Sequence, residues 1–198
     1  MSKITIKKGF AEKDRKAVAA LYSSAFKRKF EKLIGDEQTV AGFLEKGLNP
    51  NYCFSCYSAD TLVGILGFHI GKENLVSPTL SDFIKQFGFF RGVYKAVLSE
   101  FIFHKKAVSK KELLMDGVAV DKNFRGQGVG SALFDEFFVW AKAQGYEAVH
   151  LDVIDENPKA KALYERLGFV KTAHEKVPKF IKKMIGVSGV THMRKPLY

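Results

Sequence analysis

The stretch "VAVDKNFRGQGVGSALFDEFF", residues 118–138, decides how the fold of this 198-residue chain is interpreted. Its apolar start is typical of a strand and its end has the apolar spacing of a helix, with Gly126, Gly128 and Gly130 between them. The first amides of a helix lack partners inside the helix, and glycine lets the backbone approach a ligand closely. The stretch therefore predicts a concave group of N–H donors for a phosphate or pyrophosphate, with a tight turn that holds no ligand as the alternative.

Two common nucleotide loops fit these residues poorly. A P-loop requires lysine directly after its last glycine, but Gly130 is followed by Ser131 and Ala132. A dinucleotide-binding loop requires glycine or alanine three positions after Gly128, and Ser131 occupies that position. The sequence thus excludes the first loop and disfavours the second.

Strand-like and helical patterns surround this loop. Strands are predicted at residues 4–9, 52–58, 61–70, 112–120, 148–154, 169–175 and 189–197. Helices are predicted at residues 14–26, 36–48 and 131–144, and a short one within the segment 156–169. Ala59 and Asp60 separate two of the strands as a hairpin turn would, which favours antiparallel pairing. The strand, helix and strand from residue 112 to residue 154 require a crossover and therefore a parallel pair. Together the patterns predict an α+β fold with a mixed sheet in one domain, residues 1–198.

Composition sets limits on partners and location. The 32 Lys and Arg residues against 21 Asp and Glu residues give a net charge of +11, which favours phosphorylated cofactors, nucleic acid or other anionic partners. No run reaches the roughly 18 apolar residues of a spanning helix, and the N-terminus lacks the apolar core of a signal peptide. We therefore expect a cytoplasmic protein without a membrane span. Cys53 and Cys56 lie three apart in a predicted strand and are expected to be reduced and to bind no metal.

Residues 71–111 have the least regular pattern of the chain. They are rich in phenylalanine, helical in places and interrupted by Gly88 and Gly92, so we expect a helical insertion. Three roles stay open for it. It packs on the core, or forms a lid or wall that contacts an acceptor, or lies on a membrane surface, where apolar residues stand beside Arg91 and Lys95.

A second motif makes the first more specific. The segment "ENPKAKALYERLGF", residues 156–169, has Asn157 as an N-cap, Pro158 in the first helical turn and Gly168 just past the helix. Together with "RGQGVG", residues 125–130, it resembles the two signatures of the GNAT superfamily, the acyl-CoA-dependent N-acyltransferases. The order of elements along nearly the whole chain is similar to that of the family. The resemblance implies a central, mostly antiparallel sheet of about six to seven strands flanked by helices, with a splayed parallel pair in the middle.

The resemblance also implies acetyl-CoA as the cosubstrate, a primary amine as the acceptor and no metal. The amides of residues 125–131 would hold the pyrophosphate, and the free strand edge at residues 118–120 would pair with the pantetheine amides where the two parallel strands separate. The residues that the resemblance assigns to cofactor binding are Val118, Ala119, Val120, Arg125, Gly126, Gln127, Gly128, Val129, Gly130, Ser131, Asn157, Ala160 and Tyr164.

The same resemblance gives Tyr164 the role of general acid for the leaving thiolate. The alternative for Tyr164 is an ordinary buried position on the apolar side of its helix. A base must also take a proton from the amine. Some family members carry a glutamate for this purpose at a position where this chain has Leu114. Asp116, which shares strand parity with Val118 and Val120, is our candidate base, and its rivals are Glu112, Glu100, His69 and His104.

The sequence therefore predicts an N-acetyltransferase in which the amine attacks the thioester directly. Two alternatives are a protein of the same fold that binds CoA without catalysis and a basic nucleic-acid-binding protein. Positive charge is spread over many elements and no nucleic-acid module signature occurs, so we expect no nucleic-acid partner. A homodimer stays open as a common arrangement of soluble proteins, and the acceptor is not predicted.

Overall fold

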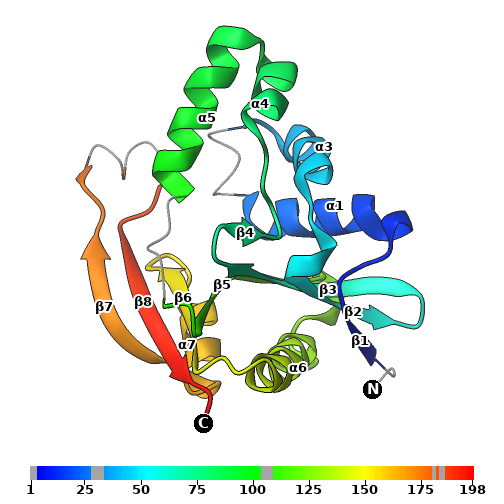
Figure 1. Cartoon of the computed structure of the whole chain (residues 1–198), viewed down its shortest axis with the longest axis vertical. Coiled ribbons are helices and arrows are strands. Elements are labelled where there is room, and N and C mark those ends of the chain that lie inside the picture. The colour runs from blue at the N-terminus through cyan, green and yellow to red at the C-terminus, as the bar shows by residue number, and fades with distance from the viewer. Residues whose placement is uncertain (1–3, 28–33, 104–108, 180–181, 183–185) are drawn as a thin grey trace.

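The computed structural model describes residues 4–27, 34–103, 109–179, 182 and 186–198. In this part of the chain eight strands form one mixed sheet in the order β1-β2-β3-β5-β6-β8-β7, with β4 on β3 (Figure 1). The strands are β1 (Ile4–Lys8), β2 (Cys53–Ser58), β3 (Thr61–Ile70), β4 (Glu73–Asn74), β5 (Glu112–Val120), β6 (Ala148–Ile154), β7 (Val170–Lys176) and β8 (Gly189–Pro196). The helices are α1 (Arg15–Ala25), α3 (Glu37–Gly47), α4 (Leu80–Phe87), α5 (Phe89–Phe103), α6 (Val129–Ala143) and α7 (Pro158–Arg166).

The predicted fold class is confirmed. All pairings between these strands are antiparallel except that of β5 with β6, and β2 and β3 form the predicted hairpin. The sheet has one strand more than the upper end of the predicted range. The extra strand is β4, whose two residues pair with His69 and Ile70 in β3, and a two-residue strand has no pattern that a sequence reveals.

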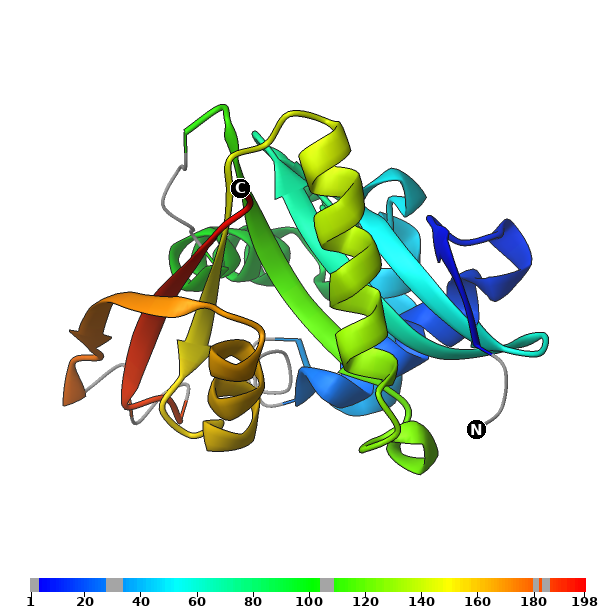
Figure 2. The same cartoon turned by 90° about the horizontal axis from the view of Figure 1, so that it is seen from below.

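The parallel pair is short and then opens. β5 and β6 pair only at Glu112 with Ala148, Leu113 with Val149 and Leu114 with His150. Beyond these pairs β5 continues to Val120 and β6 to Ile154, and Figure 2 shows the two strands moving apart toward the start of α6 and toward α7. This gap between the two strands, called the splay below, is where the sheet offers unpaired backbone.

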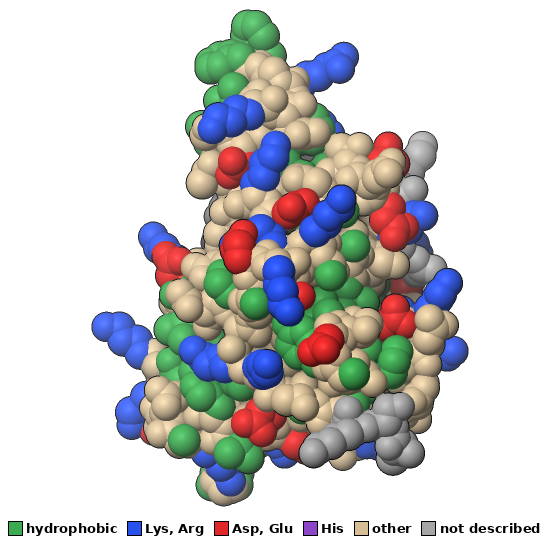
Figure 3. Space-filling model, turned by 90° about the vertical axis from the view of Figure 1, so that its right-hand side faces the viewer, with side chains coloured by type: hydrophobic (Ala, Val, Ile, Leu, Met, Phe, Trp, Pro, Cys, Tyr) green, Lys and Arg blue, Asp and Glu red, His purple; other side chains and the backbone are tan. Residues whose placement is uncertain are grey.

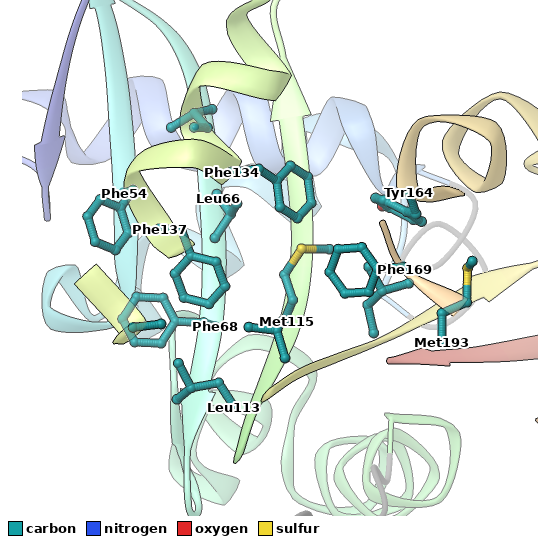
Figure 4. Close-up of a cluster of buried hydrophobic side chains, with 14 of the residues drawn as sticks. Phe54, Leu66, Phe68, Leu113, Met115, Phe134, Phe137, Tyr164, Phe169 and Met193 are labelled. Carbon is teal, nitrogen blue, oxygen red and sulfur yellow. The ribbon is translucent and has the colours of Figure 1, made fainter. Parts of the chain in front are cut away.

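Apolar clusters cover both faces of the sheet. On one face α6 and α7 pack over buried aromatic residues, including Phe54, Phe68, Phe134 and Phe169 (Figure 4). On the other face α1, α3 and α4 enclose a second cluster around Tyr22, Phe43 and Ile65. The two clusters fix which side chains of β5 point to which face, and this decides the chemistry of the splay.

The insertion forms a helical hairpin that projects from the sheet (Figure 1). Gly88, with φ of +78°, ends α4, whereas Gly92 lies inside α5 and was expected to interrupt it. A Cβ on Gly92 would come within 2.6 Å of the Ile84 backbone, so Gly92 allows the two helices to approach each other closely. Phe83 anchors the hairpin, since it is buried and its ring lies 4.8 Å from that of Phe43 in α3.

Candidate active site

The turn between β5 and α6 carries the glycines of the first motif. Gly126 has φ of +75° and Gly128 has φ of +82°, and a Cβ at either position would meet no atom within 4 Å. Glycine is therefore needed for the backbone conformation, and the space beside these two residues is open to a ligand. Gly130 differs from both, because it lies in the first turn of α6 with a helical backbone.

Two side-chain hydrogen bonds stabilise this turn. Arg125 Nε donates to the Val120 carbonyl at 3.0 Å, and Gln127 Nε2 donates to the Asn123 carbonyl at 2.7 Å. Both side chains therefore stabilise the conformation of the loop. Gly128 precedes α6 without a side-chain cap, so the first amides of this 15-residue helix stay available to an anion at its positive end.

Gly130 brings the two sequence motifs together. A Cβ on Gly130 would lie 3.9 Å from Leu163 in α7 and 3.9 Å from Val120 at the end of β5. The start of α6, the middle of α7 and the end of β5 thus meet at the mouth of the splay. Motifs about thirty residues apart in the sequence form one site.

The three predicted strand residues divide between the two faces. Val118 and Val120 are partly buried and pack on the cluster beneath α6 and α7. Ala119 is fully buried in the cluster of α1 and α3, so it can offer a ligand only its backbone. Because β6 has moved away, alternate peptide groups of β5 face the splay without a strand partner. An extended ligand with amide groups can pair with them as a strand would.

Asn157 is the predicted N-cap of α7. Its Oδ1 accepts from the Ala160 N–H at 3.2 Å, and Pro158 occupies the first turn. The cap uses only the oxygen of the amide. The side chain is exposed, and Nδ2 remains as a donor near the mouth of the splay.

Tyr164 lies on the inner side of α7. The residue is 6% exposed, and its ring makes edge contacts with Phe134 at 5.8 Å and Phe169 at 6.0 Å (Figure 4). Burial raises the pKa of Tyr164 to about 12, and its hydroxyl forms no hydrogen bond with the described residues. A phenol in this state is fully protonated at neutral pH and has its proton to donate.

Asp116 belongs to a polar group on the opposite face. The Tyr22 hydroxyl of α1 donates to Asp116 Oδ2, and His69 Nε2 of β3 lies 3.4 Å from Asp116 Oδ1. The Asp116 side chain is 10% exposed and that of His69 17%. Burial, and next the Asp116 charge, raise the pKa of Tyr22 well above 10, so Tyr22 remains a donor. His69 Nε2 is buried, and its contact with Asp116 Oδ1 does not have the geometry of a hydrogen bond.

The expectation that Asp116 shares a face with Val118 and Val120 is wrong. In the pairing of β3 with β5, Gly67 lies opposite Gly117 and Phe68 opposite Met115, so Asp116 is the extra residue of a β-bulge. The bulge shifts the alternation by one residue and turns Asp116 toward α1. Asp116 stands two residues past the last β5–β6 pair, at the closed end of the splay.

A family model described as the acetyltransferase (GNAT) family matches residues 15–169. The chain belongs to the GNAT acetyltransferase family. N-acetyltransferase 8B of Homo sapiens is 40% identical over 63 residues, which cover 32% of this chain and 28% of that protein. The matched segments span 19% to 36% of the length of the curated relatives that this chain matches.

Solved structures show the GNAT fold over the whole chain. Ard1 from Thermoplasma volcanium has a TM-score of 0.60 and 21% identity, with 98% of each chain covered. The structure of yncA from Salmonella typhimurium with its cofactor acetyl-CoA has a TM-score of 0.60 and 15% identity, with 98% of this chain and 94% of that chain covered. At these identities the likeness establishes the fold.

The other candidate bases of this GNAT chain stand apart from the splay or outside the described residues. Glu112 Oε1 accepts from Arg194 at 2.8 Å and Glu112 Oε2 lies 3.1 Å from His150, and the bond with Arg194 lowers the pKa of Glu112. Glu112 is therefore part of an ion-pair group on β5, β6 and β8. His104 and the side chain of Glu100 lie outside the described residues.

Sequence reasoning missed Tyr22. It occurs at an apolar position of the first helix and is buried, as the helical spacing indicates, but its hydroxyl also donates to Asp116. His69 and Asp116 appeared as rival bases, whereas the structure places them side by side. Residues 22, 69 and 116 share no local motif, and only the packing of α1 on the sheet brings them together.

Proposed function

We propose that this GNAT-family protein is an acetyl-CoA-dependent N-acetyltransferase that acts on a primary amine by direct attack on the thioester. The observation that carries the proposal is the meeting of β5, α6 and α7 at Gly130. It gives one open strand edge with a phosphate-binding helix start at its mouth and a protonated phenol, Tyr164, on its inner side. Phosphate, amide and sulfur are the groups that CoA presents along its length.

The residues present fit such a ligand from end to end. The open amides after Gly126 and Gly128 suit the pyrophosphate, and the basic chain favours its charge. The unpaired edge of β5 and Asn157 Nδ2 suit the pantetheine amides. Tyr164 then meets the sulfur.

Three groups of the chain would carry the reaction. Asp116, beside His69, takes the proton of the incoming amine from the face of α1, directly or through water. A backbone N–H of β5 at Val118 or Val120 donates to the thioester oxygen as negative charge develops on it. As the C–N bond forms and the C–S bond breaks, the Tyr164 hydroxyl gives its proton to the leaving thiolate, whose basicity the same apolar surroundings increase.

Calorimetry tests the cofactor and separates the alternatives. We expect heat on titration with acetyl-CoA and with desulfo-CoA, since both carry the pyrophosphate and the pantetheine amides. Release of CoA across a panel of amines, followed with a thiol reagent, then tests catalysis. Both cysteines are buried and burial raises the pKa of Cys53 to about 12, which keeps the protein's own background low. Absence of heat at millimolar ligand would overturn the cofactor, and heat without CoA release would leave a CoA-binding protein.

Replacement of Asp116 by asparagine tests the base. We expect kcat to fall about tenfold near neutral pH, with the KM for acetyl-CoA unchanged. The deficit should shrink as pH rises toward the pKa of the amine, because an amine that is already deprotonated needs no base. The matched control is Glu112→Gln, which removes a carboxylate from the same strand. Equal pH profiles of Asp116→Asn and wild type, offset by a constant factor, would contradict the role of base.

A further inference from the structure

Most of the exposed large hydrophobic residues that the structure describes lie on the projecting hairpin of α4 and α5. Nine large hydrophobic side chains are well exposed in the described residues, and five of them lie here. They are Leu80, Phe89, Phe90, Tyr94 and Val97, each more than half exposed and Phe90 at 87%. Single exposed hydrophobic residues are ordinary on protein surfaces, but a group on one element marks an interaction site.

Packing inside the chain does not account for this group. Phe90, Tyr94 and Val97 are spaced four and three residues apart and so form one side of α5. Gly92 and Ala96 form the other side, where Gly92 lies against α4 and Ala96 packs on the core. The aromatic side therefore faces away from the contacts that hold the hairpin in place.

Positive charge surrounds the aromatic side. Residues 71–111 contain eight Lys or Arg residues and three Asp or Glu residues. Lys85 and Arg91 are exposed, and Lys95 lies over the Phe87 ring at 4.6 Å on the flank of α5. Figure 3 shows hydrophobic side chains gathered at the end of the projection, with Lys and Arg side chains beneath them.

We propose that this hairpin surface, defined by Phe89, Phe90, Tyr94, Val97 and Arg91, binds an anionic lipid bilayer by lying at its interface. The projection ends in hydrophobic side chains (Figure 3), and the exposed aromatic residues can enter the boundary between head groups and acyl chains while basic side chains meet anionic head groups. No helix in the described ranges is long and apolar enough to cross a membrane, so the contact would be peripheral. The inference stands independently of the proposed activity.

Vesicle sedimentation with the full chain tests the contact. We expect binding to phosphatidylcholine vesicles that contain phosphatidylserine, and much weaker binding to vesicles of phosphatidylcholine alone. The double substitution Phe90→Ser with Tyr94→Ser should lower the vesicle–water partition coefficient about tenfold. The reason is that the two aromatic side chains which the wild type transfers from water into the bilayer interface are absent. The matched control is Val139→Ser with Val170→Ser, which removes two exposed hydrophobic residues from α6 and β7.

An environment-sensitive fluorophore gives a second measure. The buried native cysteines react poorly, so a label placed on Phe90→Cys reports that site. Its emission should shift to the blue on anionic vesicles, whereas the same label on Val139→Cys should not shift. Circular dichroism confirms that each variant is folded.

Three outcomes would overturn the proposal. The first is no vesicle binding by wild type. The second is binding that the Phe90 and Tyr94 substitutions leave unchanged, which would assign it to the net charge of +11 alone. The third is a wild-type dimer that the same substitutions convert to a monomer, which would assign the surface to a second copy of the chain.

Discussion

Replacing Tyr164 with phenylalanine should lower kcat about a hundredfold while leaving the affinity for acetyl-CoA within about a factor of two, the size expected when a general acid is lost. The change removes one oxygen and keeps the ring in its contacts with Phe134 and Phe169, so the core should remain intact. Steady-state kinetics with saturating amine, beside calorimetry with acetyl-CoA, separate the two effects.

The pH profile adds a signature to the Tyr164 prediction. An acid must be protonated to act, and burial raises the pKa of Tyr164 from its ordinary 10 to about 12. Activity due to this group is therefore complete below its pKa and lost only as pH rises toward about 12. Tyr146→Phe is the matched control, since it removes a hydroxyl from the edge of the same cluster. A full rate in Tyr164→Phe, or an equal loss in the control, would remove the acid role.

Substitution of Gly128 by valine should weaken acetyl-CoA binding about a hundredfold, which is on the order of 3 kcal/mol. Two causes act together. The left-handed backbone of Gly128 is strained for a branched residue, and the new side chain would occupy space that is open beside the loop amides. Calorimetry with acetyl-CoA measures the loss of affinity, and thermal unfolding without ligand measures the backbone strain.

Gly145 supplies the matched control for Gly128. It has φ of +80° against +82° for Gly128, and a Cβ there also meets nothing within 4 Å, but it lies just past the far end of α6. Gly145→Val should therefore cost similar stability and leave acetyl-CoA affinity unchanged. If both variants bind acetyl-CoA alike, the loop before α6 is not the phosphate site.

The two motifs were predictable because each is dense and local. In "RGQGVG" the backbone needs positive φ at Gly126 and Gly128, and glycine adopts it at lower cost than any other residue. The two glycines therefore indicate the conformation directly. Asn157 and Pro158 record the start of α7 in the same way. Their meeting at Gly130 follows from the parallel pair that separates in the middle of the sheet, which the resemblance to the GNAT family implied.

The face of Asp116 was not predictable from alternation, because a bulge of one residue reverses it. Gly117 is the one local trace of the irregularity. A Cβ there would overlap the Phe26 ring, so the strand has glycine where α1 approaches it closely. Without knowledge of how α1 packs on the sheet, Gly117 does not by itself indicate a bulge.

The hairpin of α4 and α5 was unclear in the sequence for a related reason. In α5 the exposed side carries Phe90, Tyr94 and Val97, so the usual contrast between an apolar inner side and a polar outer side is absent. Glycine usually interrupts a helix, but Gly92 lies inside α5, where it allows close contact with Ile84 in α4. Tertiary packing overrides local preference at this position.

In the described part of the chain, backbone pairing between the two halves of the sheet, one ending at β1 and the other at β7, is confined to the three β5–β6 residue pairs and the bond from the Glu147 N–H to the Lys111 carbonyl. Apolar packing beneath α6 and α7 holds the halves together on one face of the sheet, so the junction resembles a hinge. A bound pantetheine arm would act as a temporary extra strand across that hinge. Ligand binding would then slow the hydrogen exchange of backbone amides in β5 and β6 together, including amides of residues that never touch the ligand.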